Sequence, residues 1–191
     1  MNTPTSSTGI STPTGPVTVW IVEDHIALRA TLREALAGEP GVAHVEAFAS
    51  CESVLAALSV SNTQRAPAVI LMDIGLPGMS GLEGLRRFKQ VVPTAQIVMF
   101  TVFDDPERIF EAVCAGASGY LLKSEPLERI VAAVKEVQCG GAPMTPEIAR
   151  TILDRFSQLR PAKSDAELSE REREVLRLLA EGLTKKEIAV R

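Results

Sequence analysis

The sequence predicts an α/β fold, a flavodoxin-like, doubly wound, five-stranded parallel sheet with helices on both faces. Four short apolar runs are each bounded by turn-forming residues, as expected of strands that are buried on both faces, and a fifth, more polar segment over residues 42–48 also reads as a strand. Between these runs, apolar residues recur with helical spacing, so strands and helices alternate along the chain. In the strand order that is typical of this fold, 2-1-3-4-5, the first and third strands are neighbours.

The predicted elements follow one another from residue 17. Strands are expected over residues 17–22, 42–48, 68–72, 96–100 and 118–122. Helices are expected over residues 25–37, 50–58, 81–91, 104–116 and 126–139. Ser50 suits the cap of the second helix, and Pro106 suits the first turn of the fourth, where its missing N–H leaves no partner unpaired. The second strand is more polar than the others, which favours an edge of the sheet.

Composition divides the chain into four parts. Residues 1–16 are mostly Thr, Ser, Pro and Gly and predict a disordered tail, because they cannot bury enough apolar surface to offset ordering. Residues 17–141 form the α/β domain, and residues 142–166 form a linker that contains a helix over about 146–159. Residues 167–191 predict the start of an all-α helix-turn-helix module, because Ser169 and Glu172 form a capping box and Gly182 ends an apolar stripe.

Bulk properties exclude several classes of protein. A net charge of −4 argues against nucleic-acid binding by the chain as a whole, although an acidic domain can mask a mildly basic one. The sequence has no apolar stretch of membrane-spanning length and no signal-peptide pattern at its start, so we expect a cytoplasmic protein without a membrane partner. Cys51, Cys114 and Cys139 lack the paired spacing of a zinc site, and each is expected to be a buried or half-buried small hydrophobic residue.

Polar side chains end four of the predicted strands. Glu23 and Asp24 follow the first strand and Asp73 follows the third, so the three carboxylates are expected at one edge of the sheet. Such a cluster is costly without a cation, and oxygen ligands at this position suit Mg²⁺. Thr101 ends the fourth strand and Lys123 follows the fifth. A hydroxyl and an ammonium are the partners that a phosphoryl group on Asp73 would need.

Each of these residues also has an ordinary structural explanation. Asp73 could cap a strand end, and the acidic pair could be solvated before a helix. Thr101 is a common type of strand residue, and Lys123 could lie on a surface loop. The convergence of an acidic pair, an acid, a hydroxyl and an amine at matching strand ends favours the functional interpretation.

With these residues, the chain resembles the receiver domain of two-component response regulators. The LuxR-like pattern after residue 167 narrows the resemblance to the NarL/FixJ class, which regulates transcription and is not a class of enzymes. The resemblance implies that Asp73 accepts a phosphoryl group from a sensor histidine kinase. It also implies that Asp24, Asp73 and the carbonyl of Gly75 bind Mg²⁺, with Glu23 acting directly or through water.

The resemblance assigns the remaining site residues and partners. Thr101 and Lys123 would hold the phosphoryl group, and Tyr120 would belong to the switch that responds to it. A phosphorylation-dependent homodimer and DNA are the implied partners. The residues that would contact DNA remain unknown at this level.

The chain departs from the family pattern at several positions. Val102 stands where receivers usually have a smaller residue, which predicts slower access to the phosphoryl site. Ser124 follows Lys123 where the family often has proline. The recognition helix of a LuxR-type module does not occur before Arg191, so we expect this polypeptide alone not to read a DNA sequence. The alternative is a phospho-dependent adaptor that acts by protein contact. A haloacid dehalogenase-like phosphotransfer enzyme would need a second aspartate at Gly75.

Overall fold

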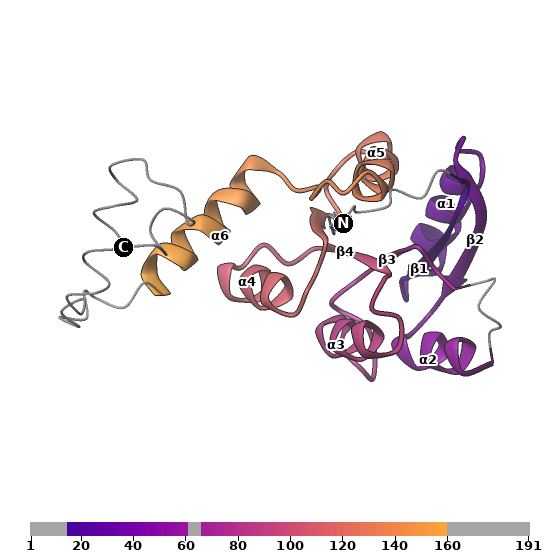
Figure 1. Ribbon diagram of the computed structural model, residues 1–191, viewed down its shortest axis with the longest axis horizontal. Helices are drawn as coiled ribbons and strands as arrows, with labels where there is room; N and C mark the ends of the chain where they lie inside the picture. Colours follow the sequence, from indigo (N-terminus) through magenta and orange to yellow (C-terminus); the bar gives the residue numbers. More distant parts are fainter. Residues whose placement is uncertain (1–14, 61–65, 160–191) are drawn as a thin grey trace, which may run out of the picture. The chain divides into compact units, whose positions relative to one another are not determined.

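The computed structural model describes residues 15–60 and 66–159. Within them, five strands form one parallel sheet in the order β2-β1-β3-β4-β5 (Figure 1). The predicted fold class and strand order are therefore confirmed. Most of the expected tail, and the expected helix-turn-helix segment at 167–191, lie outside the described residues.

The sheet brings the ends of β1 and β3 to the same level. The strands are β1 (Val17–Val22), β2 (Val42–Phe48), β3 (Val69–Met72), β4 (Gln96–Thr101) and β5 (Gly119–Leu122). In the β1–β3 pair, Val22 lies opposite Met72, so the residues that follow both strands emerge side by side. The more polar strand, β2, lies at an edge as predicted.

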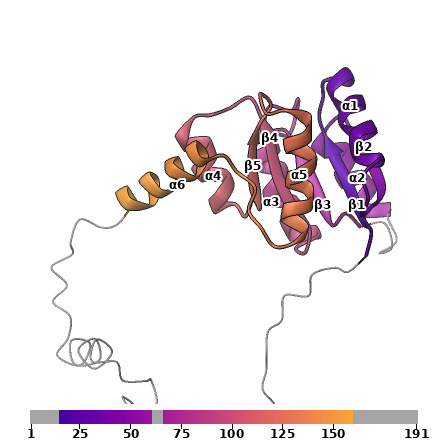
Figure 2. The ribbon, with the colours of Figure 1, turned by 90° about the horizontal axis from the view of Figure 1, so that it is seen from above.

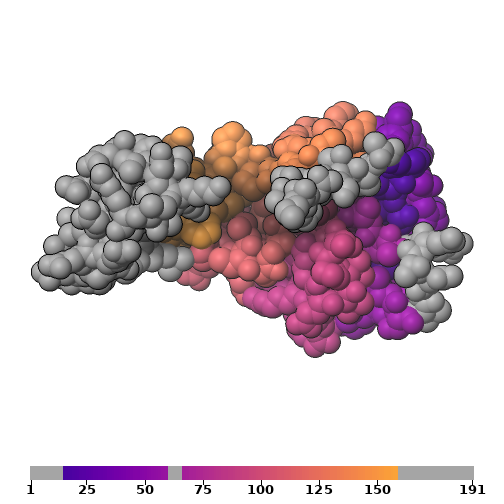
Figure 3. Space-filling view, viewed as in Figure 1, coloured from indigo at the N-terminus to yellow at the C-terminus, as the bar shows by residue number. Residues whose placement is uncertain are grey.

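Helices cover both faces of the sheet. They are α1 (Ile26–Ala37), α2 (Cys51–Val60), α3 (Gly81–Val91), α4 (Pro106–Cys114), α5 (Leu127–Gln138) and α6 (Pro146–Leu159). Helices α1 and α5 pack on one face, and α2, α3 and α4 pack on the other (Figures 1 and 2). In the space-filling view, the orange segment of α5 and the magenta segment of α3 lie on opposite sides of the domain (Figure 3). Alternate strand residues serve the two cores, with Ile21 facing α1 and α5 and Trp20 facing the opposite layer. None of the helices in residues 15–60 and 66–159 is long and apolar enough to cross a membrane.

Side-chain caps explain where three of the helices begin. His25, Ser80 and Asp105 each accept a hydrogen bond from the backbone N–H three residues later, at the starts of α1, α3 and α4. Pro106 occupies the first turn of α4, as its fixed backbone angle favours. These caps fix where the loops after β1, β3 and β4 end and the following helices begin.

The loop between β3 and α3 is held by close backbone packing. Oε1 of Glu52, on α2, accepts a hydrogen bond of 2.7 Å from the N–H of Met79. Gly78 has φ of 75°, a conformation that favours glycine, and a Cβ there would lie 2.6 Å from Glu52 Oε1. At Gly81, a Cβ would lie 1.9 Å from the backbone oxygen of Asp73. The loop that leaves Asp73 is therefore fixed from two sides.

The contact between Glu52 and this loop predicts a pH-dependent effect on stability. The Met79 N–H lowers the pKa of the Glu52 carboxyl group below its usual value of 4.5. Because the pKa is lowered in the folded state, the contact stabilises the fold above about pH 4.5 and is lost as the pH falls through the lowered pKa. We expect Glu52→Gln to decrease the melting temperature slightly at pH 7, and the difference from wild type to vanish in acid. Thermal unfolding across pH checks this, with Glu34→Gln as the exposed control; a difference that persists unchanged in acid would contradict it.

The chain beyond α5 returns to the sheet before α6 begins. The N–H of Tyr120 donates to the carbonyl of Pro143 at 2.9 Å, and Met144 forms a parallel bridge with Tyr120. Ile148 and Ile152 of α6 are 3% and 8% exposed and belong to the same apolar cluster as residues of α4. The first turns of α6 therefore pack on the α/β domain.

The three cysteines have different environments. Cys51 is fully buried, and burial raises the pKa of its thiol to about 12. Cys114 and Cys139 are exposed, so the expectation that each cysteine would be at least half-buried is wrong for these two. Cys114 is the last residue of α4, and Cys139 directly follows the last residue of α5.

Candidate functional site

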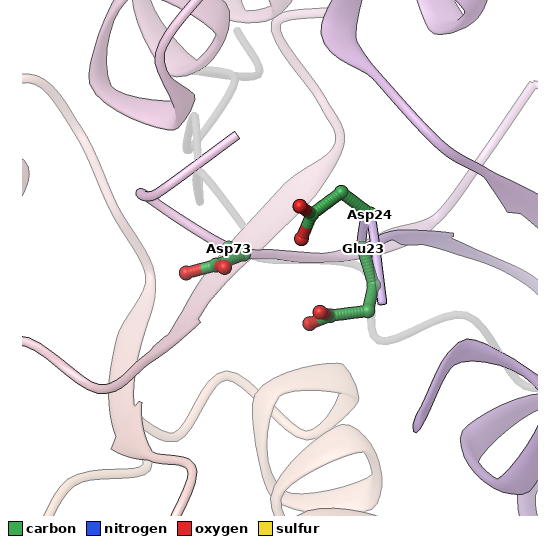
Figure 4. Close-up of side chains that lie close together, drawn as sticks. All are labelled: Glu23, Asp24 and Asp73. Carbon is green, nitrogen blue, oxygen red and sulfur yellow. The ribbon is translucent and has the colours of Figure 1, made fainter. Parts of the chain in front are cut away.

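Three carboxylates meet at the carboxyl edge of the sheet. Glu23 and Asp24 follow β1, and Asp73 follows β3. Each offers an oxygen that lies within 4.8 Å of an oxygen of the other two. Figure 4 shows the three side chains lying close together. The adjacency of β1 and β3 thus brings together residues that are about fifty positions apart in the sequence.

Lys123 joins two of these carboxylates. Its Nζ lies 2.7 Å from Oδ2 of Asp73 and 2.7 Å from Oε2 of Glu23. Glu23 is 1% exposed and Asp73 is 4% exposed, so both charges depend on this partner. Burial alone would lower the pKa of Lys123, but hydrogen bonds and charges from Asp73 and Glu23 outweigh it and raise the pKa above its usual value. Lys123 therefore stays protonated at neutral pH.

Backbone groups and one arginine fix the acidic residues further. The N–H of Gly75 donates to Oδ1 of Asp73 at 3.1 Å, and the N–H of His25 donates to Oε1 of Glu23 at 3.2 Å. Arg29 of α1 donates to the backbone oxygens of Glu23 at 2.6 Å and Asp24 at 3.0 Å. Sequence reasoning did not identify Arg29, although its position on the first turns of the helix after the acidic pair is compatible with this contact.

The donor set fits a divalent cation. Three carboxylates and one ammonium leave a formal excess of two negative charges, which a divalent ion would neutralise. The buried Oε2 of Glu23 lies close to the Lys123 ammonium, yet it accepts no hydrogen bond with acceptable geometry. This oxygen is therefore neutralised in charge by the ammonium but keeps the capacity to accept a further interaction from a cation or water. Asp24 is exposed and keeps the cluster open to solvent.

Thr101 and Tyr120 connect the site to the segment that follows β4. Thr101 is fully buried at the end of β4, and its hydroxyl accepts a hydrogen bond of 3.4 Å from the N–H of Phe103. Tyr120 is also fully buried, and its hydroxyl donates to the carbonyl of Phe103 at 2.8 Å. Burial raises the pKa of Tyr120, which keeps this hydroxyl neutral and able to donate. The aromatic ring of Phe103 packs near Gly75, where an added Cβ would lie 3.3 Å from its Cε2.

The structure thus brings together Glu23, Asp24, Asp73 and Lys123, with Gly75 attached to Asp73 by a hydrogen bond. Val102 is 67% exposed, so its side chain lies on the surface, and its predicted effect on access stays a prediction. No peptide bond in the described residues is cis, which includes the bond between Lys123 and Ser124.

Comparison with protein families identifies two regions. Residues 19–135 match the response regulator receiver domain, and residues 166–191 match the luxR family of bacterial regulatory proteins. The first region covers more than half of the chain and contains the whole acidic cluster. The second region lies outside the described residues.

Individual relatives agree with this assignment. The chain is 35% identical over 173 residues to the transcriptional regulatory protein UhpA of Escherichia coli, covering 91% of this chain and 81% of UhpA. It is 34% identical over 176 residues to the nitrate/nitrite response regulator protein NarP of the same organism, covering 91% and 79%. A LuxR-family response regulator from Aurantimonas shares the fold, with a TM-score of 0.66 and 29% identity over 75% of this chain and 99% of that one.

The fold and site define a receiver, and the match at residues 166–191 adds a LuxR-type DNA-binding segment. The chain belongs to the two-component response regulators of the NarL/FixJ class. This is a family of transcriptional regulators and not of enzymes.

Proposed function

We propose that Asp73 accepts a phosphoryl group from a sensor histidine kinase and that this event controls transcription through the LuxR-type segment. The observation that carries the proposal is the contact of Asp73 with both an acidic cluster and Lys123 at the end of β3. A carboxylate oxygen of Asp73 would attack the phosphorus of a phosphohistidine. The O–P bond forms as the P–N bond breaks, and the departing imidazole nitrogen takes a proton from solvent.

The residues around Asp73 have complementary roles in this proposal. Lys123 already lies 2.7 Å from Asp73, and its ammonium would form an ion pair with one of the new phosphoryl oxygens. Thr101 would donate its hydroxyl hydrogen to another phosphoryl oxygen. Glu23 would keep Lys123 in place, because it shares the same ammonium at 2.7 Å. When bound, Mg²⁺ would supply positive charge that offsets the charge of the phosphoryl oxygens.

Asp24, Asp73 and the Gly75 carbonyl are the proposed Mg²⁺ ligands, with Glu23 acting directly or through water. Oε1 of Glu23 is engaged by Lys123 and by the His25 N–H, so its Oε2 is the oxygen that would act toward the ion directly or through water. The charge excess of the cluster and the exposure of Asp24 support this assignment.

Replacement of Asp24 by Asn tests the metal site. We expect Asp24→Asn to weaken Mg²⁺ binding by roughly tenfold or more, because a charged ligand becomes neutral. The same change should slightly stabilise the metal-free protein, since it relieves repulsion among the carboxylates. Calorimetric titration with Mg²⁺ and melting curves with and without the ion measure both effects, and Asp104→Asn is the control. Wild-type Mg²⁺ affinity in Asp24→Asn would refute the site.

The output of the proposed event is a population shift in the segment from Val102 to Tyr120. Within this segment, Phe103 is hydrogen-bonded to the hydroxyls of Thr101 and Tyr120. Movement of Thr101 toward a phosphoryl group would therefore loosen the hydrogen bond between the Phe103 N–H and Thr101. We propose a homodimer and DNA as the downstream partners and the cytoplasm as the location. The match of residues 166–191 to the luxR family of bacterial regulatory proteins supports DNA as a partner.

Labelling by a small phosphodonor tests the proposed function. The protein is incubated with acetyl phosphate and Mg²⁺, and wild type and Asp73→Asn are compared by intact mass. We expect one phosphoryl group on wild type and none on the variant, because the asparagine amide cannot form an acyl phosphate. Equal labelling of the two proteins would reject Asp73 as the acceptor.

A further inference from the structure

One arginine binds three consecutive backbone carbonyls at the turn between β1 and α1. Nη1 of Arg29 donates to the carbonyl of Glu23 at 2.6 Å and to that of Asp24 at 3.0 Å. The backbone N–H of the same residue donates to the carbonyl of His25 at 3.0 Å, in the first turn of α1. Glu23 and Asp24 lie after β1 and before α1, so neither regular element supplies the hydrogen bonds of their carbonyls. Arg29 supplies them and thereby fixes the path of the acidic turn.

The carboxylates of the cluster are held in different ways, although they lie close together (Figure 4). Those of Glu23 and Asp73 each lie 2.7 Å from the Lys123 ammonium, which limits where they can point. Asp24 is exposed, and among the residues that the structure describes its hydrogen-bond donor reaches its backbone oxygen and not its carboxylate. The Asp24 side chain therefore depends on its backbone for its direction toward the cluster, and Arg29 holds the carbonyl end of that backbone.

The charge of Arg29 and its hydrogen bonds act on a bound cation in opposite directions. A guanidinium near the cluster repels a second cation, so its charge alone lowers the affinity for Mg²⁺. Its hydrogen bonds raise that affinity, because they hold the Asp24 carboxylate near the oxygens of Glu23 and Asp73 before the ion arrives. Arg29 is partly exposed, and solvent screens its charge but leaves the two short hydrogen bonds in place. The positioning effect is therefore expected to be the larger one.

We propose that Arg29 is a positioning residue for the Mg²⁺ site and acts through the backbone of Asp24, an inference that rests on the proposed function. Residues that orient a metal ligand in this way typically change the affinity for the ion by about ten- to a hundredfold. The side chain of Arg29 binds the acidic turn and not Asp73 or Lys123. It should therefore set the Mg²⁺ concentration at which Asp73 is phosphorylated, and not the rate once the ion is saturating.

Calorimetric titration of the full chain with Mg²⁺ alone measures this role. We expect Arg29→Ala to bind Mg²⁺ about tenfold more weakly than wild type. Arg33→Ala is the matched control, because it removes the same charge from an exposed position one turn later on α1, and its affinity should stay within about twofold of wild type. Arg29→Lys keeps the charge and a donor, so its affinity should lie between those of wild type and Arg29→Ala. A melting curve of the metal-free protein checks folding, and Arg29→Lys, with its smaller loss of affinity, replaces Arg29→Ala if the latter does not fold.

Two further measurements separate positioning from a general loss of structure. In the Asp24→Asn background, Arg29→Ala should lower the Mg²⁺ affinity by less than about threefold, since the ligand that Arg29 positions has already lost its charge. Labelling with acetyl phosphate should need about tenfold more Mg²⁺ for half its maximal rate in Arg29→Ala than in wild type. The labelling rate at saturating Mg²⁺ should be the same in the two proteins.

A Mg²⁺ affinity equal to or above that of wild type in Arg29→Ala would overturn the inference, because the charge of Arg29 would then outweigh its hydrogen bonds. An equal loss with and without the Asp24 carboxylate, or a slower labelling rate that saturating Mg²⁺ does not restore, would overturn it as well. Labelling that is absent from wild type, or that persists in Asp73→Asn, would instead overturn Asp73 as the acceptor, and the calorimetric result would still decide the role of Arg29.

Discussion

Gly81→Ala is expected to destabilise the receiver by about 3 kcal/mol, at the upper end of the usual cost of overpacking. A Cβ at Gly81 would lie 1.9 Å from the backbone oxygen of Asp73 and 2.8 Å from Cα of Ile74. Both neighbours are backbone atoms, so no side-chain rotation can relieve the overlap. The strand end that carries Asp73 must therefore shift, and Mg²⁺ binding and phosphoryl labelling should weaken with stability.

Chemical denaturation measures the change in the free energy of unfolding for this variant. Gly38→Ala is the matched control, because Gly38 has a φ of −84° and a Cβ there would meet no atom closer than 3.9 Å. We expect the control to differ from wild type by less than about 0.5 kcal/mol. If Gly81→Ala is as stable as Gly38→Ala, the backbone packing between α3 and the end of β3 is not as tight as described.

Lys123→Met is expected to destabilise the metal-free protein by about 3 kcal/mol, because it leaves two buried carboxylates without their shared cation. Glu23 and Asp73 are 1% and 4% exposed, and the Lys123 side chain is 15% exposed. Mg²⁺ should recover part of the loss by supplying positive charge to the same cluster. Labelling of Asp73 should also slow by roughly a hundredfold, the usual effect of removing a group that stabilises developing negative charge.

The pH dependence of the Lys123 contribution has a definite sign. The pKa of Lys123 is raised in the folded state above its usual value of 10.5, so its pairing stabilises the fold fully below about pH 10.5. That contribution is lost only as the pH rises through the raised pKa. Urea denaturation at pH 7 with and without Mg²⁺ measures the main effect. Lys135→Met, which removes an exposed pair with Glu39, should change stability by less than about 1 kcal/mol. If the two variants lose equal free energy of unfolding, the buried ion pairs of Lys123 stabilise the fold no more than an exposed pair does.

The fold was predictable because four of the five strands read as apolar runs and every helix of the domain has a start or stop signal. Residues on both faces of β1 and β3 are buried, so the strand pattern is continuous and distinct from the amphipathic helices. The acidic cluster followed from the same logic, since parallel neighbours end at one edge. The positions of Glu23, Asp24 and Asp73 needed no knowledge beyond strand ends and strand order.

The remaining details depend on contacts that have no local sequence signal. The hydrogen bond from the Met79 N–H to Glu52 joins residues that only tertiary packing brings together, and the contacts of Arg29 with Glu23 and Asp24 depend on how α1 leaves the end of β1. The docking of α6 was also not predicted, because Ile148 and Ile152 form an amphipathic stripe that would suit a linker helix equally well. The exposure of Cys114 and Cys139 depends in turn on where α4 and α5 end.

The central claim is that Asp73 is the residue that carries the phosphoryl group. The most direct measurement is to label the protein with acetyl phosphate and Mg²⁺, trap the acyl phosphate by borohydride reduction and map the reduced residue by peptide mass spectrometry. The account predicts reduction at residue 73 alone, at a level that falls when Mg²⁺ is removed and also falls in Asp24→Asn. Reduction at Glu23, at Asp24 or at any other carboxylate, with residue 73 unmodified, would contradict it.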